Sequence, residues 1–352
     1  MDYSEIDYTS SLETIINYKL MIENRLSIFI PTFNRWEVLS KTLPHTLDHL
    51  PKGFIVRVVS NNSTKEGRGA IEKVMSDHPR VDCKIIDNSA NIGPDANFLR
   101  CVELCETPYI LILGDDDYLK NNFIKNINFY LKQKTQWGWV NFQVKKSYGE
   151  VHLKDRSFKN PFKMISSCNN WAELMFISSS IFSTKLFKNG LCDAHQWQST
   201  WSALPLAVLK GWEKQEHNTL SEINYSFMLS AREIVESTGH NDTHYSQVDI
   251  YQHLPITDRV NFNTLTRKKI IKRAIRGGVK RIFKPRVLAK HFYTRVLQQS
   301  PSKSLMDYKT LCQGLEYMIG LKAYYYKPYL AVVMLTAWTA KSITKLVKKN
   351  VV

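Results

Sequence analysis

The sequence predicts an α/β protein with a mostly parallel, doubly wound sheet and a basic helical C-terminal extension. The first observation behind this prediction is that short apolar runs alternate with segments of helical periodicity between residues 26 and 131. The loops between them are short, which favours parallel strands joined by helical crossovers. The second observation is that Lys and Arg dominate the composition after residue 258. A chain of 352 residues is long enough for one large domain with appendages.

The expected elements follow one another in a regular order. We expect strands over residues 26–30, 54–59, 82–86, 109–113 and 139–144. We expect helices over residues 35–50, 69–78 and 94–105, and wholly or partly helical segments over residues 171–187 and 197–210. The chain then divides into a polar helical lead-in (1–25), an α/β domain (26–258, with halves 26–131 and 132–258) and a basic helical region (259–352).

Three consecutive carboxylates, Asp115, Asp116 and Asp117, follow Gly114 at the end of a predicted strand. Adjacent carboxylates repel one another strongly when they are buried without a partner. A hard divalent cation is a suitable partner, because Mg²⁺ and Mn²⁺ take oxygen ligands and share them with substrate phosphates. The alternative is an acidic turn in solvent, since Asp and Gly are common turn residues.

Polar segments also follow the first two strands, at residues 31–35 and 60–64. Ligands of doubly wound sheets bind beyond the carboxyl ends of the strands. We therefore expect these segments and the three Asp residues to converge on one cleft.

Four motifs in this order resemble the nucleotide-binding half of a family 2 glycosyltransferase with the GT-A fold. The motifs are residues 30–35 (IPTFNR), 58–64 (VVSNNST), 88–98 (NSANIGPDANF) and 113–117 (LGDDD). The resemblance is strong over residues 26–131 and weak over 132–258, the acceptor half, and it is to bacterial O-antigen enzymes of the abequosyltransferase type. It implies a metal-dependent, inverting transfer of a sugar from a nucleotide-sugar donor to a lipid-linked (polyprenyl pyrophosphate) oligosaccharide in O-antigen or capsule synthesis.

The resemblance also assigns residues to the donor. Asn61 stands where many relatives carry an Asp that reads the base, so the identity of the base stays open. The glycine and proline at 93–94 would also suit an ordinary helix start. The positions implied for the nucleotide sugar are Pro31, Thr32, Arg35, Asn61, Asn91, Gly93, Asp95, Asp115 and Asp116.

The acidic motif departs from the common Asp-Ser-Asp-Asp form of the family. Gly114 takes the place of the first Asp, and Asp115 takes that of the Ser. Asp116 then matches the carboxylate that meets Mn²⁺ or Mg²⁺, and Asp117 is a second candidate ligand.

His240 lies in a later polar loop that fits a lid over the diphosphate and would complete the metal shell. An ordinary solvent loop is the alternative. The cation would neutralise the leaving diphosphate.

An inverting transfer needs a base near the acceptor hydroxyl. The acidic pair that relatives often carry has no clean counterpart in this chain. The available groups are Asp193, His195, Glu213 and Glu216. Asp193 and His195 lie where relatives place the acceptor-facing segment, which makes them the candidate catalytic residues; the alternative is that these are ordinary surface groups.

The basicity of the chain is a C-terminal property. Between residues 259 and 306 there are 14 Lys and Arg and no Asp or Glu, in a chain of net charge +16. Residues 267–276 place Ile and Ala on one helical face opposite the cations, which is typical of helices that lie on anionic membranes. The alternative is a helical C-terminal domain with a solvated basic face.

Two other classes of function are alternatives to an enzyme at the membrane. Nucleic-acid binding would use the basic region, but no recognised motif accompanies the charge and the first 258 residues are not basic. A GT-A-like protein that binds nucleotide sugar without turnover stays open, because Asn61 and the missing acidic pair depart from the family pattern.

The expected location is the cytoplasm, peripheral to the inner face of the cell membrane. The apolar run 329–340 is shorter than the roughly 20 residues that a membrane span needs. The six cysteines include no CxxC pair and suggest a reducing compartment. The first residues lack a signal-peptide pattern.

Overall fold

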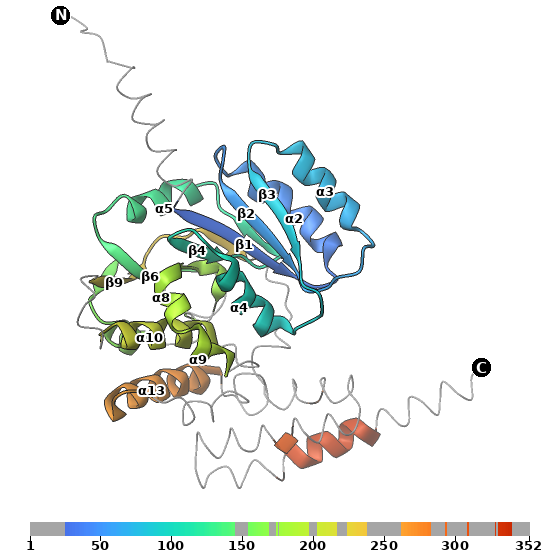
Figure 1. Cartoon of the computed structure of the whole chain (residues 1–352). Coiled ribbons are helices and arrows are strands. Elements are labelled where there is room, and N and C mark those ends of the chain that lie inside the picture. The colour runs from blue at the N-terminus through green and yellow to red at the C-terminus, as the bar shows by residue number, and fades with distance from the viewer. Residues whose placement is uncertain are drawn as a thin grey trace, which may run out of the picture. The chain divides into compact units, whose positions relative to one another are not determined.

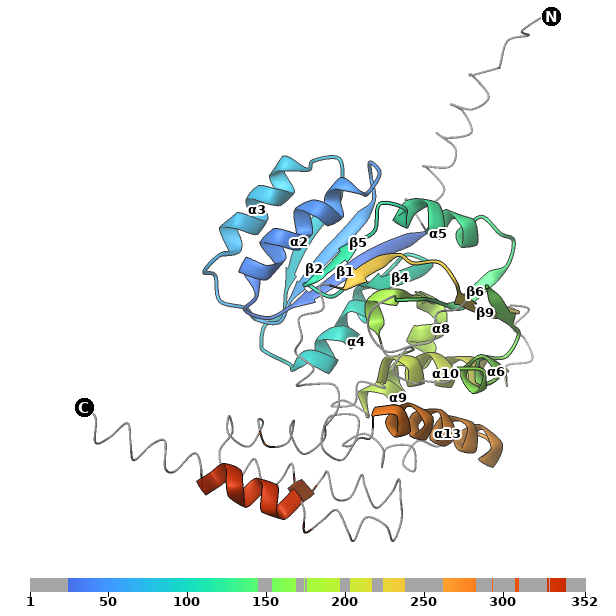
Figure 2. The same cartoon turned by 180° about the vertical axis from the view of Figure 1, so that it is seen from behind.

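A computed structural model describes residues 25–144, 154–168, 174, 176–196, 203–216, 224–237, 262–282, 293, 308–309, 328 and 330–339 (Figures 1 and 2). The predicted lead-in before residue 25 and the candidate ligand His240 lie outside these residues. The chain forms two compact units. The first comprises Met1–Met164, Glu173–Ser199 and Ala203–Thr238, and the second comprises Ile165–Ala172, Thr200–Ser202 and Gly239–Val352.

The first unit is built on an eight-stranded sheet with the order β3-β2-β1-β4-β8-β6-β9-β7. Its first four strands run parallel, as the sequence predicts. Both β1 and β4 are buried along their whole length, which is the usual state of parallel strands covered on both faces. These strands are β1 (Leu26–Thr32), β2 (Ile55–Ser60), β3 (Asp82–Asp87) and β4 (Tyr109–Ile112).

The other half of the sheet is mixed. Strand β8 (Ser180–Ser183) lies antiparallel between β4 and β6 (Gln136–Phe142). Strand β9 (Tyr225–Ser230) runs parallel to β6, and β7 (Arg156–Phe158) closes the edge antiparallel to β9. The expectation of helix over residues 171–187 was wrong at β8, because four buried residues are too few to display a strand period beside the helix that follows.

Helices cover the two faces of this sheet (Figures 1 and 2). On one face α2 (Trp36–Asp48) packs beside α3 (Arg68–Asp77), and α2 buries Leu39, Leu43 and Leu47 at helical spacing. On the other face α4 (Pro94–Leu104) contacts α8 (Thr184–Asn189), α9 (Leu191–His195) and α10 (Ala203–Glu216). Pro94 begins α4, where its missing N–H costs nothing. The remaining short elements are α5 (Phe123–Leu131), α6 (Pro161–Ser166) and the 3₁₀ helix η1 (Ile177–Ser179).

A second, two-stranded sheet begins at the acidic motif. Strand β5 (Asp117–Leu119) pairs antiparallel with β10 (Val235–Ser237), so that Asp117 lies opposite Ser237. The chain therefore leaves β4, makes the turn through residues 114–116 and enters β5 at once. This pairing fixes the backbone on the far side of the turn.

The second unit contains α13 (Leu265–Ile282), which confirms the predicted helix over residues 267–276. On the apolar face of α13, Ile271 and Ala274 are buried. In the parts of the chain described above, no helix combines the length and the apolar character that crossing a membrane requires.

Candidate functional site

The polar loops after β1, β2 and β4 meet at the carboxyl edge of the parallel strands, as expected. The backbone N–H of Asn61 donates to the carbonyl of Thr32 over 2.9 Å, and the N–H of Asn88 donates to the carbonyl of Ser60 over 2.9 Å. The Thr32 hydroxyl donates to Oδ2 of Asp115 over 2.8 Å. Segments that are far apart in the sequence are therefore fixed to one another here.

The loop between β1 and α2 is held to the loop after β2. Oδ1 of Asn34 accepts from the N–H of Thr64 over 2.8 Å, and the N–H of Asn34 donates to the Ser63 hydroxyl over 3.0 Å. The indole of Trp36 donates to the Thr64 carbonyl over 2.6 Å. Asn34 has a φ of 53°, a left-handed conformation that Asn tolerates better than most residues. The two loops are thus joined by three hydrogen bonds.

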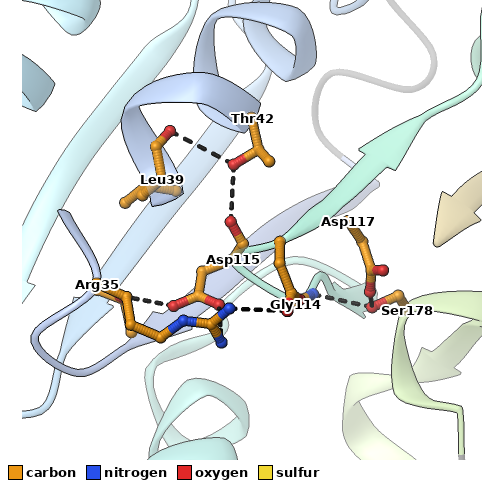
Figure 3. A network of polar contacts seen from close by, with 9 residues as sticks. Arg35, Leu39, Thr42, Gly114, Asp115, Asp117 and Ser178 are labelled. Atoms are coloured by element: carbon orange, nitrogen blue, oxygen red, sulfur yellow. Dashed lines mark hydrogen bonds and ion pairs between the residues drawn. The ribbon is translucent and has the colours of Figure 1, made fainter. Parts of the chain in front are cut away.

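Asp115 is buried at the centre of this edge (Figure 3). Its carboxylate accepts from Thr32 and forms an ion pair of 2.8 Å with Nη1 of Arg35. Its carbonyl accepts from the Thr42 hydroxyl of α2 over 2.8 Å. Burial raises the pKa of Asp115 to about 6, although Arg35 and Thr32 favour the charged form. Asp115 thus ties the acidic motif to β1 and α2.

Asp116 points away from the core. Its side chain is 30% exposed, and its Oδ2 atom forms an ion pair of 2.8 Å with Nη2 of Arg35. The two nitrogens of one guanidinium therefore join Asp115 and Asp116. Of the three carboxylates, Asp116 is the most exposed.

Asp117 is buried and folds back over Gly114 (Figure 3). A Cβ placed on Gly114 would lie 2.7 Å from Oδ2 of Asp117 and 3.2 Å from Oδ1 of Asp116. A side chain there would therefore displace a carboxylate of the acidic motif. The hydroxyl of Ser178, which precedes β8, donates to Oδ2 of Asp117 over 2.6 Å. Sequence reasoning missed Ser178, because a serine before an unrecognised strand carries no signal.

The donor set fits a divalent cation of the Mg²⁺ or Mn²⁺ type. Carboxylate oxygens of Asp116 and Asp117 both lie within 3.2 Å of the point that the missing Cβ of Gly114 would occupy. Both carboxylates therefore border the same point, where a bound cation would offset the repulsion between them. Among the described residues there is no group of three or more His, Cys, Asp and Glu arranged for a metal. Magnesium sites commonly use one or two carboxylates together with substrate phosphates, which matches this set.

Asn61 organises the loop that follows β3. Its side-chain amide donates to Oδ1 of Asn91 over 2.8 Å and to the Gly93 carbonyl over 3.2 Å. Its Oδ1 accepts from the N–H of Ile92 over 2.9 Å and from the Asn88 amide over 3.2 Å. The residue is only 2% exposed. An Asn is suited to this position because a carboxylate could not donate the first two hydrogen bonds.

The other residues assigned to the nucleotide sugar lie at the same edge. Pro31 is buried in β1, and Asp95 lies in the first turn of α4. Asn91 is exposed on the loop before α4. Gly93 has a φ of 86°, which favours glycine. The structure therefore brings the predicted donor positions together.

The two candidate catalytic residues lie elsewhere, on α9. Oδ2 of Asp193 forms an ion pair of 2.6 Å with Lys214, and Nε2 of His195 lies 2.9 Å from Oε1 of Glu103. Glu103 is in the last turn of α4, a helix that starts at the carboxyl edge of the sheet and runs back to the amino edge. Asp193 and His195 are therefore not brought together with the three Asp residues.

The other two acidic groups considered for the base lie on α10. Glu213 is buried and forms an ion pair of 2.8 Å with Lys210 one turn earlier. Glu216 is exposed at the end of the helix.

Comparison with known proteins bears on the same region. Residues 27–187 match the family model described as Glycosyl transferase family 2. This part of the chain is a family 2 glycosyltransferase domain. The match contains β1 to β4, the acidic motif and Ser178. It confirms the family that the four sequence motifs indicated.

A curated relative agrees with this assignment over a shorter stretch. The chain is 30% identical over 107 residues to Abequosyltransferase RfbV from Salmonella typhimurium. The match covers 30% of this chain and 32% of RfbV, so the chain spans about a third of the length of this relative.

Solved structures show the fold of the glycosyltransferase domain. The crystal structure of S. aureus TarS 1–349 matches with a TM-score of 0.53 at 13% identity, over 93% of this chain and 92% of TarS 1–349. The same protein in complex with UDP-GlcNAc matches with a TM-score of 0.51 at 13% identity, over the same shares. The predicted GT-A fold is confirmed.

Proposed function

We propose that this chain is a metal-dependent, inverting glycosyltransferase that moves a sugar from a nucleotide-sugar donor to a lipid-linked oligosaccharide. One observation carries the proposal: the residues that match the family 2 model include Asp116 and Asp117, whose carboxylates converge over Gly114 at the exit of β4. Residues 26–131 form the nucleotide-binding half in this proposal, and residues 132–258 form the acceptor half.

In this proposal the chain supplies a preformed donor site. Asp116 and Asp117 hold Mn²⁺ or Mg²⁺, which when bound neutralises the charge of the leaving diphosphate. The joined loops after β1 and β2, together with the loop that Asn61 holds, shape the pocket for the nucleoside and ribose. Arg35 joins Asp115 to Asp116 and keeps the acidic motif in place while the pocket is formed.

The acceptor is proposed to be anionic and carried by lipid. Support comes from the basic helix α13 and from the described helical residues 330–339. In the latter, Leu330, Met334 and Ala337 are buried, while Val332 is 60% and Leu335 is 54% exposed. Residues 328–340 carry no charged side chain. An outward apolar face within a basic region suits the interface of an anionic membrane.

The proposed role is bacterial surface polysaccharide synthesis, at the inner face of the cell membrane. The similarity to Abequosyltransferase RfbV supports this role, and it lies in a 107-residue stretch. The acceptor would be a polyprenyl pyrophosphate saccharide of an O-antigen or capsule.

A second candidate is a protein of this fold that binds nucleotide sugar without turnover. It is favoured by one observation: Asp193 and His195 are engaged with Lys214 and Glu103 away from the acidic motif.

The experiment that separates the two uses the full chain and UDP-, GDP-, CDP- and dTDP-linked sugars, each with and without Mn²⁺. Thermal shift identifies the donor class, and release of nucleoside diphosphate measures turnover. A transferase gives a shift and metal-dependent release. A shift without release at any donor concentration supports the second candidate and contradicts the first.

A further inference from the structure

Ser178 closes a ring of hydrogen bonds around the acidic motif (Figure 3). The N–H of Gly114 donates to the Ser178 hydroxyl over 2.8 Å, and that hydroxyl donates to Oδ2 of Asp117 over 2.6 Å. The N–H of Asp117 in turn donates to the carbonyl of Gly114 over 3.1 Å. Ser178 thus links η1 to both ends of a four-residue turn that lies more than sixty positions earlier in the chain.

The direction of these bonds is fixed by chemistry. A backbone N–H only donates, so the Ser178 oxygen accepts from Gly114 and its single proton is directed to Asp117. The length of 2.6 Å is typical of a hydroxyl bonded to a charged carboxylate. Ser178 is only 1% exposed and Asp117 is buried, so solvent does not replace the hydroxyl at this point.

This ring sets where the Asp117 carboxylate points. Its Oδ2 atom is held over Gly114, 2.7 Å from the point that a Cβ would occupy, and Oδ1 of Asp116 lies 3.2 Å from the same point. The hydroxyl orients the carboxylate without adding a positive charge of its own. An orienting group that adds no charge preserves the attraction of the carboxylate for a cation.

We propose that Ser178 is a positioning residue that holds the Asp117 carboxylate in the orientation needed to bind a divalent cation beside Asp116. The inference rests on the proposed function, because it takes Asp116 and Asp117 as the metal-binding pair. The proposal adds to the site a residue from the segment 132–258, the proposed acceptor half. Groups that orient metal ligands commonly change metal affinity by about 10-fold to 100-fold when they are removed.

The test is a titration of the full chain with Mn²⁺, in which electron paramagnetic resonance measures free Mn²⁺ without any turnover. Ser178→Ala is expected to raise the Kd for Mn²⁺ by about 10-fold or more. The matched control is Ser179→Ala, since Ser179 is an adjacent buried serine. Its hydroxyl donates to the Phe176 carbonyl over 2.7 Å and accepts from the Asn141 amide over 3.5 Å. The control is expected to keep the wild-type Kd.

A double variant separates positioning from general damage. If Ser178 acts through Asp117, adding Ser178→Ala to Asp117→Asn leaves the Kd of the single Asp117→Asn variant unchanged. Ser178→Cys, which is slightly larger and a weaker donor, serves if Ser178→Ala does not fold. Wild-type affinity in a folded Ser178 variant, or full additivity with Asp117→Asn, would overturn the inference while leaving the proposed function intact. A wild-type chain that binds no Mn²⁺, either alone or with any nucleoside diphosphate of the panel, would overturn both.

Discussion

Asp116 is the most exposed carboxylate of the acidic motif, and it forms an ion pair with Arg35. We predict that Asp116→Ala abolishes Mn²⁺-dependent nucleotide binding and sugar transfer and keeps the fold, because the side chain is not part of the core. Thermal shift with Mn²⁺ and nucleotide, together with an activity assay, checks this.

A matched control for Asp116 is available at the amino end of β3. Asp82 also pairs with an arginine, Arg57, over 2.7 Å, but at the opposite edge of the sheet. Asp82→Ala should retain metal-dependent binding. Near-normal transfer by the Asp116 variant at saturating donor would contradict the assignment.

The second prediction concerns Asp115 and pH. Burial raises its pKa from 3.8 to about 6, against the pull of Arg35 and Thr32. Between these two values the folded state holds a proton that the unfolded state has released, so stability falls as pH rises through this window. This shift in pKa corresponds to a loss of about 3 kcal/mol in the free energy of unfolding across the window.

Asp115→Asn removes this titration and keeps an acceptor oxygen. Relative to the wild type, its free energy of unfolding should therefore increase by about 3 kcal/mol between pH 4 and pH 7. Urea unfolding of both proteins at several pH values measures the difference. Parallel pH profiles would show that Asp115 does not titrate in this range.

The third prediction concerns Asn61. Its amide makes four hydrogen bonds to the loop of residues 88–93. We expect Asn61 to act on the nucleotide through this loop. Asn61→Asp places a carboxylate against the Asn91 Oδ1 atom and the Gly93 carbonyl, and should destabilise the protein by about 2 kcal/mol and weaken nucleotide binding. Asn62→Asp, at the exposed neighbour with a φ of 58°, is the control. Unchanged stability and binding in the Asn61 variant would contradict this.

At the scale of elements, two glycines let α8 and α10 pack closely. A Cβ on Gly190 would lie 1.8 Å from the Ala207 carbonyl oxygen, and one on Gly211 would lie 1.9 Å from the Leu186 carbonyl oxygen. Because both obstacles are backbone atoms, only a shift of a helix relieves them. We predict that Gly190→Ala and Gly211→Ala each destabilise the first unit by about 3 kcal/mol or more.

Gly69 in α3 offers the control, since a Cβ there meets nothing within 4 Å. Gly69→Ala should instead stabilise the protein by up to about 1 kcal/mol through helix propensity. Chemical unfolding measures all three variants. A Gly190 or Gly211 variant as stable as the wild type would mean that the helices are not in this close contact.

The elements that the sequence predicted well are those with a clear period and strong boundaries. Strands β1 and β4 are mainly apolar runs that are buried along their length, and α4 starts at a Gly-Pro pair. Strand β8 and the short pair β5 and β10 were not predicted, because their pairing depends on partners distant in the sequence. The local sequence pattern of a strand does not show which distant strand it pairs with.

The same limit applies to the candidate site. The loops after β1, β2 and β4 were expected to converge, because their positions follow from strand direction alone. The roles of Ser178 and of the Asn61 hydrogen bonds depend on side-chain contacts between loops, which the sequence does not encode locally. The ion pairs of Asp193 and His195 likewise depend on how α9 packs against α4 and α10.

At the scale of the whole molecule, charge is segregated along the chain. Fourteen Lys and Arg lie between residues 259 and 306 without an acid, and an apolar helix face follows at Val332 and Leu335. Each cation near an anionic leaflet contributes about 1 kcal/mol, so several together hold a protein without a spanning helix. Apolar side chains at the interface add to this attraction. The two kinds of group should therefore make separable contributions.

We predict that the full chain co-sediments with vesicles containing anionic lipid and much less with neutral vesicles. Binding should weaken as salt rises, because exposed charges are screened beyond about 8 Å at physiological ionic strength. The double variant Val332→Ser and Leu335→Ser should bind anionic vesicles more weakly and keep the same salt dependence, since it removes apolar contact alone. Phe129→Ser, which alters an exposed apolar residue of the first unit, should have no effect. Equal sedimentation with neutral and anionic vesicles would show that the basic region is a solvated surface, because attraction by charge requires the wild type to distinguish the two.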